Sequence, residues 1–292
     1  MRIAKYHGTG NDFVMLEDLA DRVTPTPELV RALCDRRFGV GGDGLIRIAP
    51  ARGAADFFMD YWNANGEVAE MCGNGIRCLG KLVHDEGLTA REELDVLTRA
   101  GVKHLVLDIG DARVRRVTVD MGPPAFDRAA IPMAGDPQER FLLGQIEAGG
   151  RTFTATALSM GNPHCVLFLE PTDDLAEMDV PGIGRAVERS ALFPNRTNVE
   201  FVTVEDGRVR LRVWERGSGE TMACGTGACA ALVACAQAGL TSRRAEVEFP
   251  GGLLEVDWRE DDQAFLTGPA VCVFRAEVDE AWLAQLQAGV AR

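Results

Sequence analysis

Short apolar runs, separated by glycine, proline and polar turns, recur along the whole chain and predict a protein built mainly of β-strands. Many of these runs are rich in valine, leucine and isoleucine, which suit a pleated, half-buried surface. Residues 123–150 have no such run and indicate a polar linker. The expected strands are residues 2–6, 13–16, 45–48, 57–62, 94–98, 102–109, 113–121, 151–158, 165–169, 199–204, 209–214, 247–249, 253–258, 264–267 and 271–277.

Helical spacing is confined to a few segments, and one of them is apolar on every side. The expected helices are residues 27–36, 74–86, 183–189, 226–238 and a last one near the C-terminus. Residues 226–238 carry only Gln237 as a strongly polar side chain, so that helix must be enclosed all round. Because its neighbours are strands, we expect an α/β (α+β) fold. Each half would be a barrel-like, curved and mostly antiparallel sheet around one central helix.

The two halves of the chain repeat each other at a spacing of 151 or 152 residues. The matching pairs are CGNG at 72–75 and CGTG at 224–227, GLT at 87–89 and 239–241, and GN at 10–11 and 161–162. Such agreement at one spacing indicates an internal duplication, with two pseudo-symmetric domains and one equivalent cysteine in each.

A break in the strand pattern places the domain boundary. Met-Gly-Pro-Pro at 121–124 interrupts the strands, and Gly-Pro at 268–269 echoes it. We therefore predict an N-terminal domain of residues 1–122, to which residues 271–292 return, and a C-terminal domain of residues 123–270. The active site is expected in the cleft between them.

Cys72 and Cys224 each precede a glycine-containing turn at the start of an expected helix. The unpaired N–H groups and the positive end of the dipole at a helix start stabilise a thiolate, so the sequence predicts a lowered thiol pKa. The same N–H groups can hold a carboxylate of a substrate. Two facing thiols with matched pKa values could remove a proton from one face of a carbon and return one to the other.

Composition limits the partners. Lys and Arg total 31 against 44 Asp and Glu, and the formal charge of −13 argues against nucleic acid or an anionic membrane surface. No apolar run approaches a membrane span, and the first residues, MRIAKYHGTGNDF, lack the apolar segment of a signal peptide. We expect a cytoplasmic protein that acts on a small molecule.

The other cysteines are expected to fill the core. The chain has eight cysteines but no Cys-x-x-Cys pair, which favours neither a disulfide framework nor a zinc site, and we predict no metal. The expected core cysteines are Cys34, Cys78, Cys165, Cys229, Cys235 and Cys272.

The glycine-rich stretch Gly39–Gly44 does not predict a dinucleotide site. It matches Gly-x-Gly-x-x-Gly, but it lacks the preceding strand and the following helix that such a site needs.

Several polar residues near the repeated turns allow two interpretations. Asn11 alone is more typical of a turn residue, but its counterpart Asn162 suggests that both contact a substrate. Glu215 and Arg216 could hold an ammonium and a carboxylate, or could form a surface ion pair. His164 could assist a thiol or support a turn.

Four motifs together resemble the diaminopimelate epimerase family, over nearly the whole chain. They are HGTGNDF at 7–13, MCGNGIRC at 71–78, GNPH at 161–164, and WERGSGET with ACGTG at 214–221 and 223–227. The resemblance implies a cofactor-independent isomerase, with no pyridoxal phosphate, that interconverts LL- and meso-2,6-diaminopimelate in lysine and peptidoglycan precursor synthesis. It also implies the two-domain fold above and a homodimer.

The resemblance assigns roles to individual residues. Cys72 and Cys224 would be the two acid/base thiols, with Cys72 serving the LL face and Cys224 the D,L face. The implied substrate contacts are Asn11, Asn63, Asn162, Asn198, Glu215 and Arg216, with Gly73, Asn74, Gly225 and Thr226 at the reacting carboxylate. His164 is a possible supporting residue.

The chain departs from the family pattern at two places. Some members have a glutamine that contacts substrate where this chain has Gly44, and Asn65-Gly66-Glu67 stands where Asp-Gly-Ser is commoner. Two alternatives remain. One is a proline or hydroxyproline racemase-type enzyme, and the other is a thiol switch in which Cys72 and Cys224 form a disulfide on oxidation.

Overall fold

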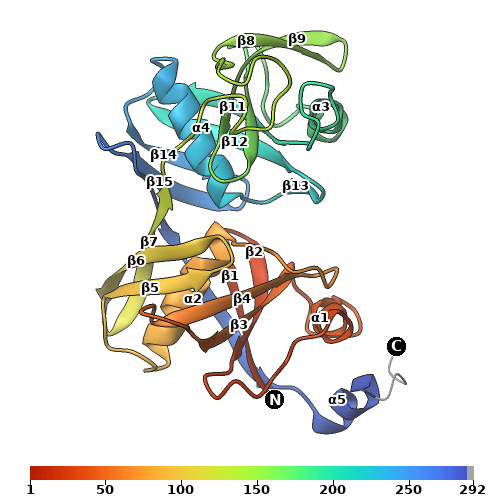
Figure 1. The fold of residues 1–292 in the computed structure, drawn as a ribbon, viewed down its shortest axis with the longest axis vertical. Helices are drawn as coiled ribbons and strands as arrows, with labels where there is room; N and C mark the ends of the chain where they lie inside the picture. The colour runs from red at the N-terminus through yellow and green to blue at the C-terminus, as the bar shows by residue number, and fades with distance from the viewer. Residues whose placement is uncertain (288–292) are drawn as a thin grey trace. The chain divides into compact units, whose positions relative to one another are not determined.

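The computed structural model describes residues 1–287, and the chain divides into two compact units. The first unit comprises Met1–Val119 together with the chain from Gly268 onward, and the second comprises Asp120–Thr267. In each unit the strands curve around one long helix (Figure 1). The last five residues of the expected C-terminal return, 288–292, lie outside the described residues.

The first unit is built on a sheet whose strands follow the order β17, β1 to β7. Its helices are α1 (Pro27–Cys34), α2 (Gly73–Asp85) and α5 (Glu280–Gln287), and Thr26 is the N-cap residue of α1. Its strands are β1 (Arg2–Gly8), β2 (Asn11–Glu17), β3 (Gly44–Pro50), β4 (Phe57–Asn63), β5 (Glu93–Thr98), β6 (Gly101–Gly110), β7 (Arg113–Gly122) and β17 (Val271–Glu277).

The second unit has the same plan. Its helices are α3, Val180–Glu188, and α4, Gly225–Gln237. Its strands are β8 (Gly144–Ala148), β9 (Arg151–Ser159), β10 (Pro163–Phe168), β11 (Asn198–Glu205), β12 (Arg208–Glu215), β13 (Gly219–Thr221), β14 (Arg244–Phe249), β15 (Gly252–Trp258) and β16 (Ala264–Pro269).

The strand pairings of the two units match one for one. From β17 through β1 to β7, the successive pairings are antiparallel, antiparallel, parallel, antiparallel, parallel, antiparallel and antiparallel. The same series runs from β8 through β9, β10, β11, β12, β14 and β15 to β16. The structure therefore repeats as the sequence does. The strand β17, near the C-terminus, occupies in the first unit the place that β8 has in the second.

The helix α4 lies inside its sheet, as its uniformly apolar sequence predicts. Every residue from Ala228 to Cys235 is fully buried, and the helix packs against β9 to β12, β14 and β15. Small alanine and cysteine side chains let the strands approach the helix closely on all sides. No helix among residues 1–287 is both long and apolar enough to cross a lipid bilayer.

The structure contains two strands that the sequence pattern missed. The strand β8 falls in the stretch interpreted as a linker, because Ile146 is its one large apolar residue. The strand β13 has only three residues, Gly219–Thr221, and none of them is a large apolar residue. The expectation for Cys272 was also wrong, since this residue of β17 is partly exposed, whereas the other five expected core cysteines are buried.

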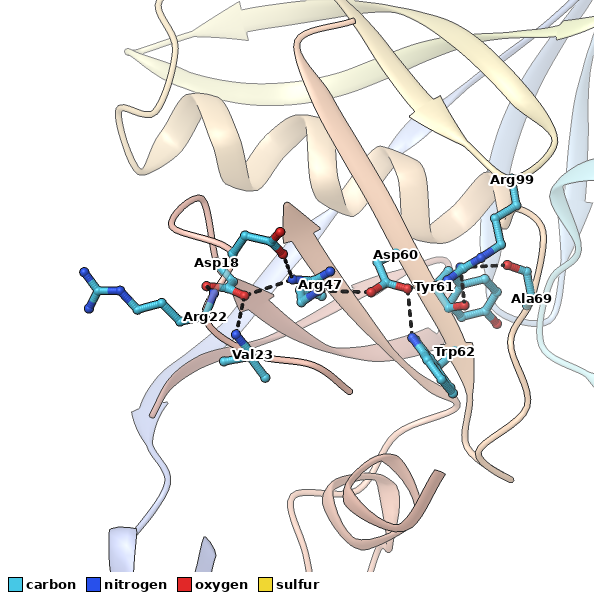
Figure 2. Close-up of polar contacts among 10 residues, drawn as sticks. Asp18, Arg22, Val23, Arg47, Asp60, Tyr61, Trp62, Ala69 and Arg99 are labelled. Atoms are coloured by element: carbon cyan, nitrogen blue, oxygen red, sulfur yellow. Dashed lines mark hydrogen bonds and ion pairs between the residues drawn. The ribbon is translucent and has the colours of Figure 1, made fainter. Parts of the chain in front are cut away.

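A network of charged side chains joins the strands of the first unit to the loop that leads to Cys72 (Figure 2). The Arg47 guanidinium lies 3.0 Å from carboxylate oxygens of both Asp18 and Asp60. Asp60 also pairs with Arg99 at 2.6 Å, and Arg99 donates to the carbonyl of Ala69, three residues before Cys72. The Asp18 and Asp60 side chains are only 5% exposed, so these charges depend on their partners.

Replacing Asp60 with alanine should destabilise the protein by about 3 kcal/mol, because two arginines would lose the carboxylate they share. Urea unfolding would measure this loss. Arg2→Ala is the control, because it removes an exposed pair with Glu277 and should change the free energy of unfolding little. Equal effects of the two substitutions would contradict the role assigned to Asp60.

Candidate active site

Cys72 and Cys224 occupy the same position in their units, as the repeated motif predicts. Each is the N-cap residue of the central helix, with φ and ψ of −138° and 120° at Cys72 and −128° and 119° at Cys224. Their carbonyls accept the first helical hydrogen bonds, from Ile76 and Ala228 respectively. Each sulfur thus lies beside a helix start, where backbone N–H groups have no partner within the helix.

The surroundings of Cys224 oppose its ionisation. Burial raises the pKa of the Cys224 thiol well above its usual value, and the Glu215 carboxylate raises it further. The Thr226 hydroxyl, 3.5 Å from the sulfur, and the Gly227 N–H act in the opposite direction. The sequence expectation of a lowered pKa is therefore wrong for Cys224 without substrate. The helix start is present, but desolvation and a neighbouring carboxylate outweigh it.

Glu215, the last residue of β12, connects Cys224 to the strand β13. Its carboxylate accepts a hydrogen bond from the Thr221 hydroxyl at 2.5 Å. Burial raises the pKa of the Glu215 carboxyl, against the hydrogen bonds from Thr221 and Cys224 that lower it. A carboxyl and a thiol in contact, both with raised pKa values, form a site that a cation would stabilise.

Asn198 fixes the loop that carries Arg216. Its side-chain amide donates to the Pro163 carbonyl at 2.9 Å and accepts from the Arg216 backbone N–H at 2.8 Å. The Arg216 guanidinium lies on the surface and donates to the carbonyl of Asn195. Among residues 1–287 this is the one hydrogen bond of the Arg216 guanidinium, whose other N–H groups can bind an anion such as a carboxylate.

A chain of hydrogen bonds leads from a buried ion pair to Cys224. His164 and Glu200 are both fully buried, and Nδ1 of the histidine lies 2.7 Å from the carboxylate. Nε2 of His164 lies 3.0 Å from the side-chain oxygen of Asn162, and the side-chain NH₂ group of Asn162 donates to the Thr226 hydroxyl at 3.2 Å. The structure thus brings together three residues singled out from the sequence, His164, Asn162 and Thr226.

The equivalent network in the first unit has another composition. The side-chain amide of Asn11 donates to Asp43 at 2.7 Å, and the side-chain oxygen of Asn11 accepts from the Cys72 thiol at 3.5 Å. The same oxygen accepts from the Asn74 amide at 3.2 Å. Asn74 in turn accepts from Arg77, a fully buried arginine that also donates to the Gly73 carbonyl. Asn11, Asn74 and Gly73 therefore form one cluster with Cys72.

Asn63 ends β4 as Glu215 ends β12. The side-chain oxygen of Asn63 accepts a hydrogen bond from the Tyr61 hydroxyl at 2.9 Å. A larger residue at position 44 would meet both backbone and side chain here, because a β-carbon on Gly44 would lie 2.5 Å from the Trp62 carbonyl oxygen and 2.7 Å from the Tyr61 ring. In this chain the tyrosine occupies the space in which a longer side chain at position 44 would begin.

Besides Arg77, sequence reasoning missed four polar residues of these clusters, namely Asp43, Tyr61, Glu200 and Thr221. Glu200 left a signal, since it is the one charged residue in the apolar stretch Val199–Val202 of a buried strand. The other three are of types common in turns and strands, and only the folded chain shows their contacts. Among residues 1–287, no group of three or more His, Cys, Asp or Glu side chains could hold a metal ion.

The chain has the fold class seen in solved structures of a probable proline racemase and of a hydroxyproline epimerase. A probable proline racemase from Agrobacterium radiobacter K84 has a TM-score of 0.68 at 16% identity, over 96% of this chain and 93% of that one. A PhzF-family phenazine biosynthesis protein from Bacillus anthracis has a TM-score of 0.71 at 16% identity, over 96% and 99%. At these identities the likeness shows the fold alone.

Within that class the chain belongs to the diaminopimelate epimerase family. The family model matches residues 3–126 and 156–273. The diaminopimelate epimerase of Moorella thermoacetica is 47% identical over 280 residues, which cover 95% of this chain and 99% of that protein. The enzyme of that name from Desulfovibrio desulfuricans is 45% identical over 284 residues, 95% and 98% of the two chains.

Replacing Glu215 with glutamine should make Cys224 more reactive in the protein without substrate. The change removes the carboxylate that raises the thiol pKa, so more thiolate is present at a given pH. The rate of carboxamidomethylation of Cys224 by iodoacetamide at pH 8, followed by peptide mass spectrometry, should rise severalfold. Cys72 in the same sample is the control, and a slower reaction at Cys224 would contradict this reading.

Proposed function

We propose that this protein interconverts LL- and meso-2,6-diaminopimelate by moving a proton at one α-carbon between two thiols, without a cofactor. The observation that carries the proposal is the pair of cysteines at equivalent helix starts in a chain of this family. We further propose that the two units present Cys72 and Cys224 to opposite faces of the same carbon.

In the proposed reaction the two cysteines together carry one thiol proton, both before and after each turnover. The thiolate of one cysteine takes the proton from the α-carbon, and the electron pair left behind delocalises into the adjoining carboxylate. The thiol of the other cysteine then protonates the carbon from the opposite face, which inverts the centre and leaves that sulfur as a thiolate. The next turnover starts from the reverse pair of protonation states or after proton exchange with solvent.

Helix starts suit the carboxylate at the reacting centre. The backbone around Gly73 and Asn74, and around Gly225 and Thr226, supplies N–H donors at the positive ends of α2 and α4. These donors would stabilise the additional negative charge that the carboxylate carries while the α-carbon is deprotonated.

An ammonium group of the substrate would change the state of Cys224. We propose that it binds at Glu215, whose carboxylate raises the pKa of the neighbouring thiol. A bound cation offsets that carboxylate, so Cys224 would ionise more readily with substrate present than without it. Arg216, with its exposed guanidinium, would hold a carboxylate by paired hydrogen bonds. Asn11, Asn63, Asn162 and Asn198 would complete the contacts.

We also propose a homodimer and a place in the cytoplasm, where precursors of lysine and peptidoglycan are made. The strand β17 pairs with β1 and carries the exposed apolar side chains Val271, Val273 and Phe274, with 42%, 56% and 43% of their surface accessible. Apolar side chains gathered on one strand are typical of a protein interface. Light scattering on the purified protein would give the mass that tests the dimer.

The proposed reaction can be tested by proton NMR in deuterated water. Reduced protein with LL-diaminopimelate should replace the α-proton with deuterium and yield the meso isomer. Cys72→Ala and Cys224→Ala should each abolish epimerisation, because one face of the carbon would lose its proton donor or acceptor. A mixture of the two variants should remain inactive if both thiols of one chain act on the same carbon.

Two other outcomes would redirect the assignment. If LL-diaminopimelate returns without deuterium and proline racemises, the chain is a proline racemase-type enzyme with the same two-thiol chemistry. If freshly reduced protein acts on neither substrate and a Cys72–Cys224 disulfide forms on oxidation, the result would contradict the epimerase and support the thiol switch.

A further inference from the structure

The carboxylate of Glu188, the last residue of α3, contacts the chain on both sides of Glu215 and Arg216. One of its oxygens accepts a hydrogen bond from the Trp214 indole N–H at 2.9 Å, and the other accepts from the Gly217 backbone N–H at 3.1 Å. Trp214 directly precedes the two residues and Gly217 directly follows them. A single side chain therefore holds the turn after β12, residues 215–218, from both sides.

The burial of Glu188 makes this turn costly to move. Glu188 is only 3% exposed, and a carboxylate taken out of water needs donors in place of the lost water. The Arg196 guanidinium lies 3.9 Å from the same carboxylate, so the two short hydrogen bonds are those from Trp214 and Gly217. A displaced turn would leave the buried carboxylate with poorer partners, which fixes the turn against α3.

The helix α3 comes close enough for this contact because a glycine faces the tryptophan. A β-carbon on Gly184 would lie 2.6 Å from the β-carbon of Trp214, so a larger residue would push the helix away. The Arg185 guanidinium lies over the indole ring, 5.6 Å from its centroid. The position of α3 relative to the end of β12 is thus set by packing, and Glu188 reaches the turn from that position.

The duplicated fold provides a matched turn in the first unit. Trp62 and Trp214 are each the penultimate residue of a strand, β4 or β12, that ends at the turn. The Trp62 indole N–H donates to Asp60 of its own strand at 2.8 Å. The helix α1 contacts this turn through Arg31, which donates to the Asn65 carbonyl at 3.2 Å. A side chain of a short helix therefore holds each turn, but its chemistry differs between the units.

The contact in the second unit is the better protected of the two. The Arg31 side chain is 51% exposed and the Glu188 side chain is 4% exposed, so water competes with the first hydrogen bond much more than with the second. The turn of the first unit follows a neutral residue, Asn63, whereas the turn of the second unit carries the charged residues Glu215 and Arg216. The buried contact thus holds the turn that carries the ionic side chains.

Glu215 and Arg216 depend on this contact to different degrees. Glu215 is the last residue of β12, and the Thr221 hydroxyl holds its carboxylate. Arg216 lies beyond the strand, and its backbone is held by Asn198 before it turns and by Glu188 immediately after it. Loss of the Glu188 carboxylate should therefore disturb Arg216 and leave Glu215 in place.

We propose that Glu188 is a positioning residue that directs the Arg216 guanidinium to the substrate carboxylate farther from the reacting carbon. This role in binding rests on the proposed function, which places the nearer carboxylate at the helix starts, whereas the anchoring of the turn does not. Paired hydrogen bonds between a guanidinium and a carboxylate require aligned planes, so a turn free to shift would bind a dicarboxylate more weakly. Proton transfer would be unaffected, because α2 and α4 place the two sulfurs.

Hydrogen exchange at Gly217 tests the anchor without substrate. Glu188→Leu fills the same space but offers no acceptor, so the Gly217 N–H should exchange with deuterium about tenfold faster, as followed by NMR at fixed pH. The control is the Gly66 N–H, which donates to the Asn63 carbonyl in the matched turn and should exchange at its original rate. Unchanged exchange at Gly217 would overturn the proposal.

A conservative replacement separates the acceptor from the charge and from packing. Glutamine has one acceptor oxygen, which is enough when only one donor remains. In a Trp214→Phe background, which removes the indole donor, Glu188→Gln should therefore keep the Gly217 N–H protected, whereas Glu188→Leu should not. Fast exchange in Glu188→Gln with Trp214→Phe would contradict the role of the acceptor. This comparison also serves if Glu188→Leu alone does not fold, because no indole N–H is then left unpaired.

Kinetics test whether Glu188 acts through Arg216. Glu188→Leu should raise KM for LL-diaminopimelate about tenfold and change kcat by less than about twofold, because a contact remote from the reacting carbon contributes equally to substrate and transition-state binding. Arg216→Ala should raise KM at least as much, and adding Glu188→Leu to it should change nothing further. A large fall in kcat, or effects on KM that add, would overturn the proposal.

Alkylation of Cys224 distinguishes a selective effect from a general disturbance of the site. Because Thr221 still holds Glu215 beside this thiol, the rate of its reaction with iodoacetamide should be the same in Glu188→Leu as in the wild type. A changed rate would contradict the selective role. If wild-type protein does not act on LL-diaminopimelate, the proposed function fails, and exchange at Gly217 still decides whether Glu188 anchors the turn.

Discussion

The N–H groups at the start of a buried helix, which have no partner within the helix itself, are the constraint around which each unit is built. A helix that begins inside a protein must satisfy these donors without water, and here a cysteine is the N-cap residue in both units. The enclosing sheet holds α4 rigidly because that helix has no exposed side chain between Ala228 and Cys235. The position of each sulfur is thus a property of the whole unit and not of a loop.

Duplication supplied the two helix starts, and later substitution made them different. The backbone dihedral angles at Cys72 and Cys224 are nearly the same, yet the neighbouring polar groups differ. The Asn11 side-chain oxygen accepts from the Cys72 thiol, whereas the Thr226 hydroxyl and the Glu215 carboxylate lie beside Cys224. In the proposed reaction one sulfur accepts a proton and the other donates one, and this arrangement suits that exchange. Similar geometry brings both within reach of the same chemistry, while different neighbours set which sulfur holds the proton more tightly.

The repeat, the central helices and the family could be predicted from the sequence, because these depend on local patterns and on motifs of contiguous residues. The raised pKa of the Cys224 thiol could not be predicted in this way. The helix start visible in Gly225–Gly227 argued for a lowered pKa, but burial and the approach of Glu215 from β12 act across a fold that no local pattern encodes. Glu200 interrupts an apolar stretch, but that pattern alone does not tell that its carboxylate is buried beside the start of α4.

The strand β17 has a consequence for how the protein is made. The second unit is one continuous stretch of chain, Asp120–Thr267, so all of its strands are available once that stretch has left the ribosome. The first unit, although synthesised earlier, lacks the partner of β1 until residues 271–277 emerge. The half that is translated first is therefore completed last, and until then the edge of β1 is open to any other strand that the cell offers.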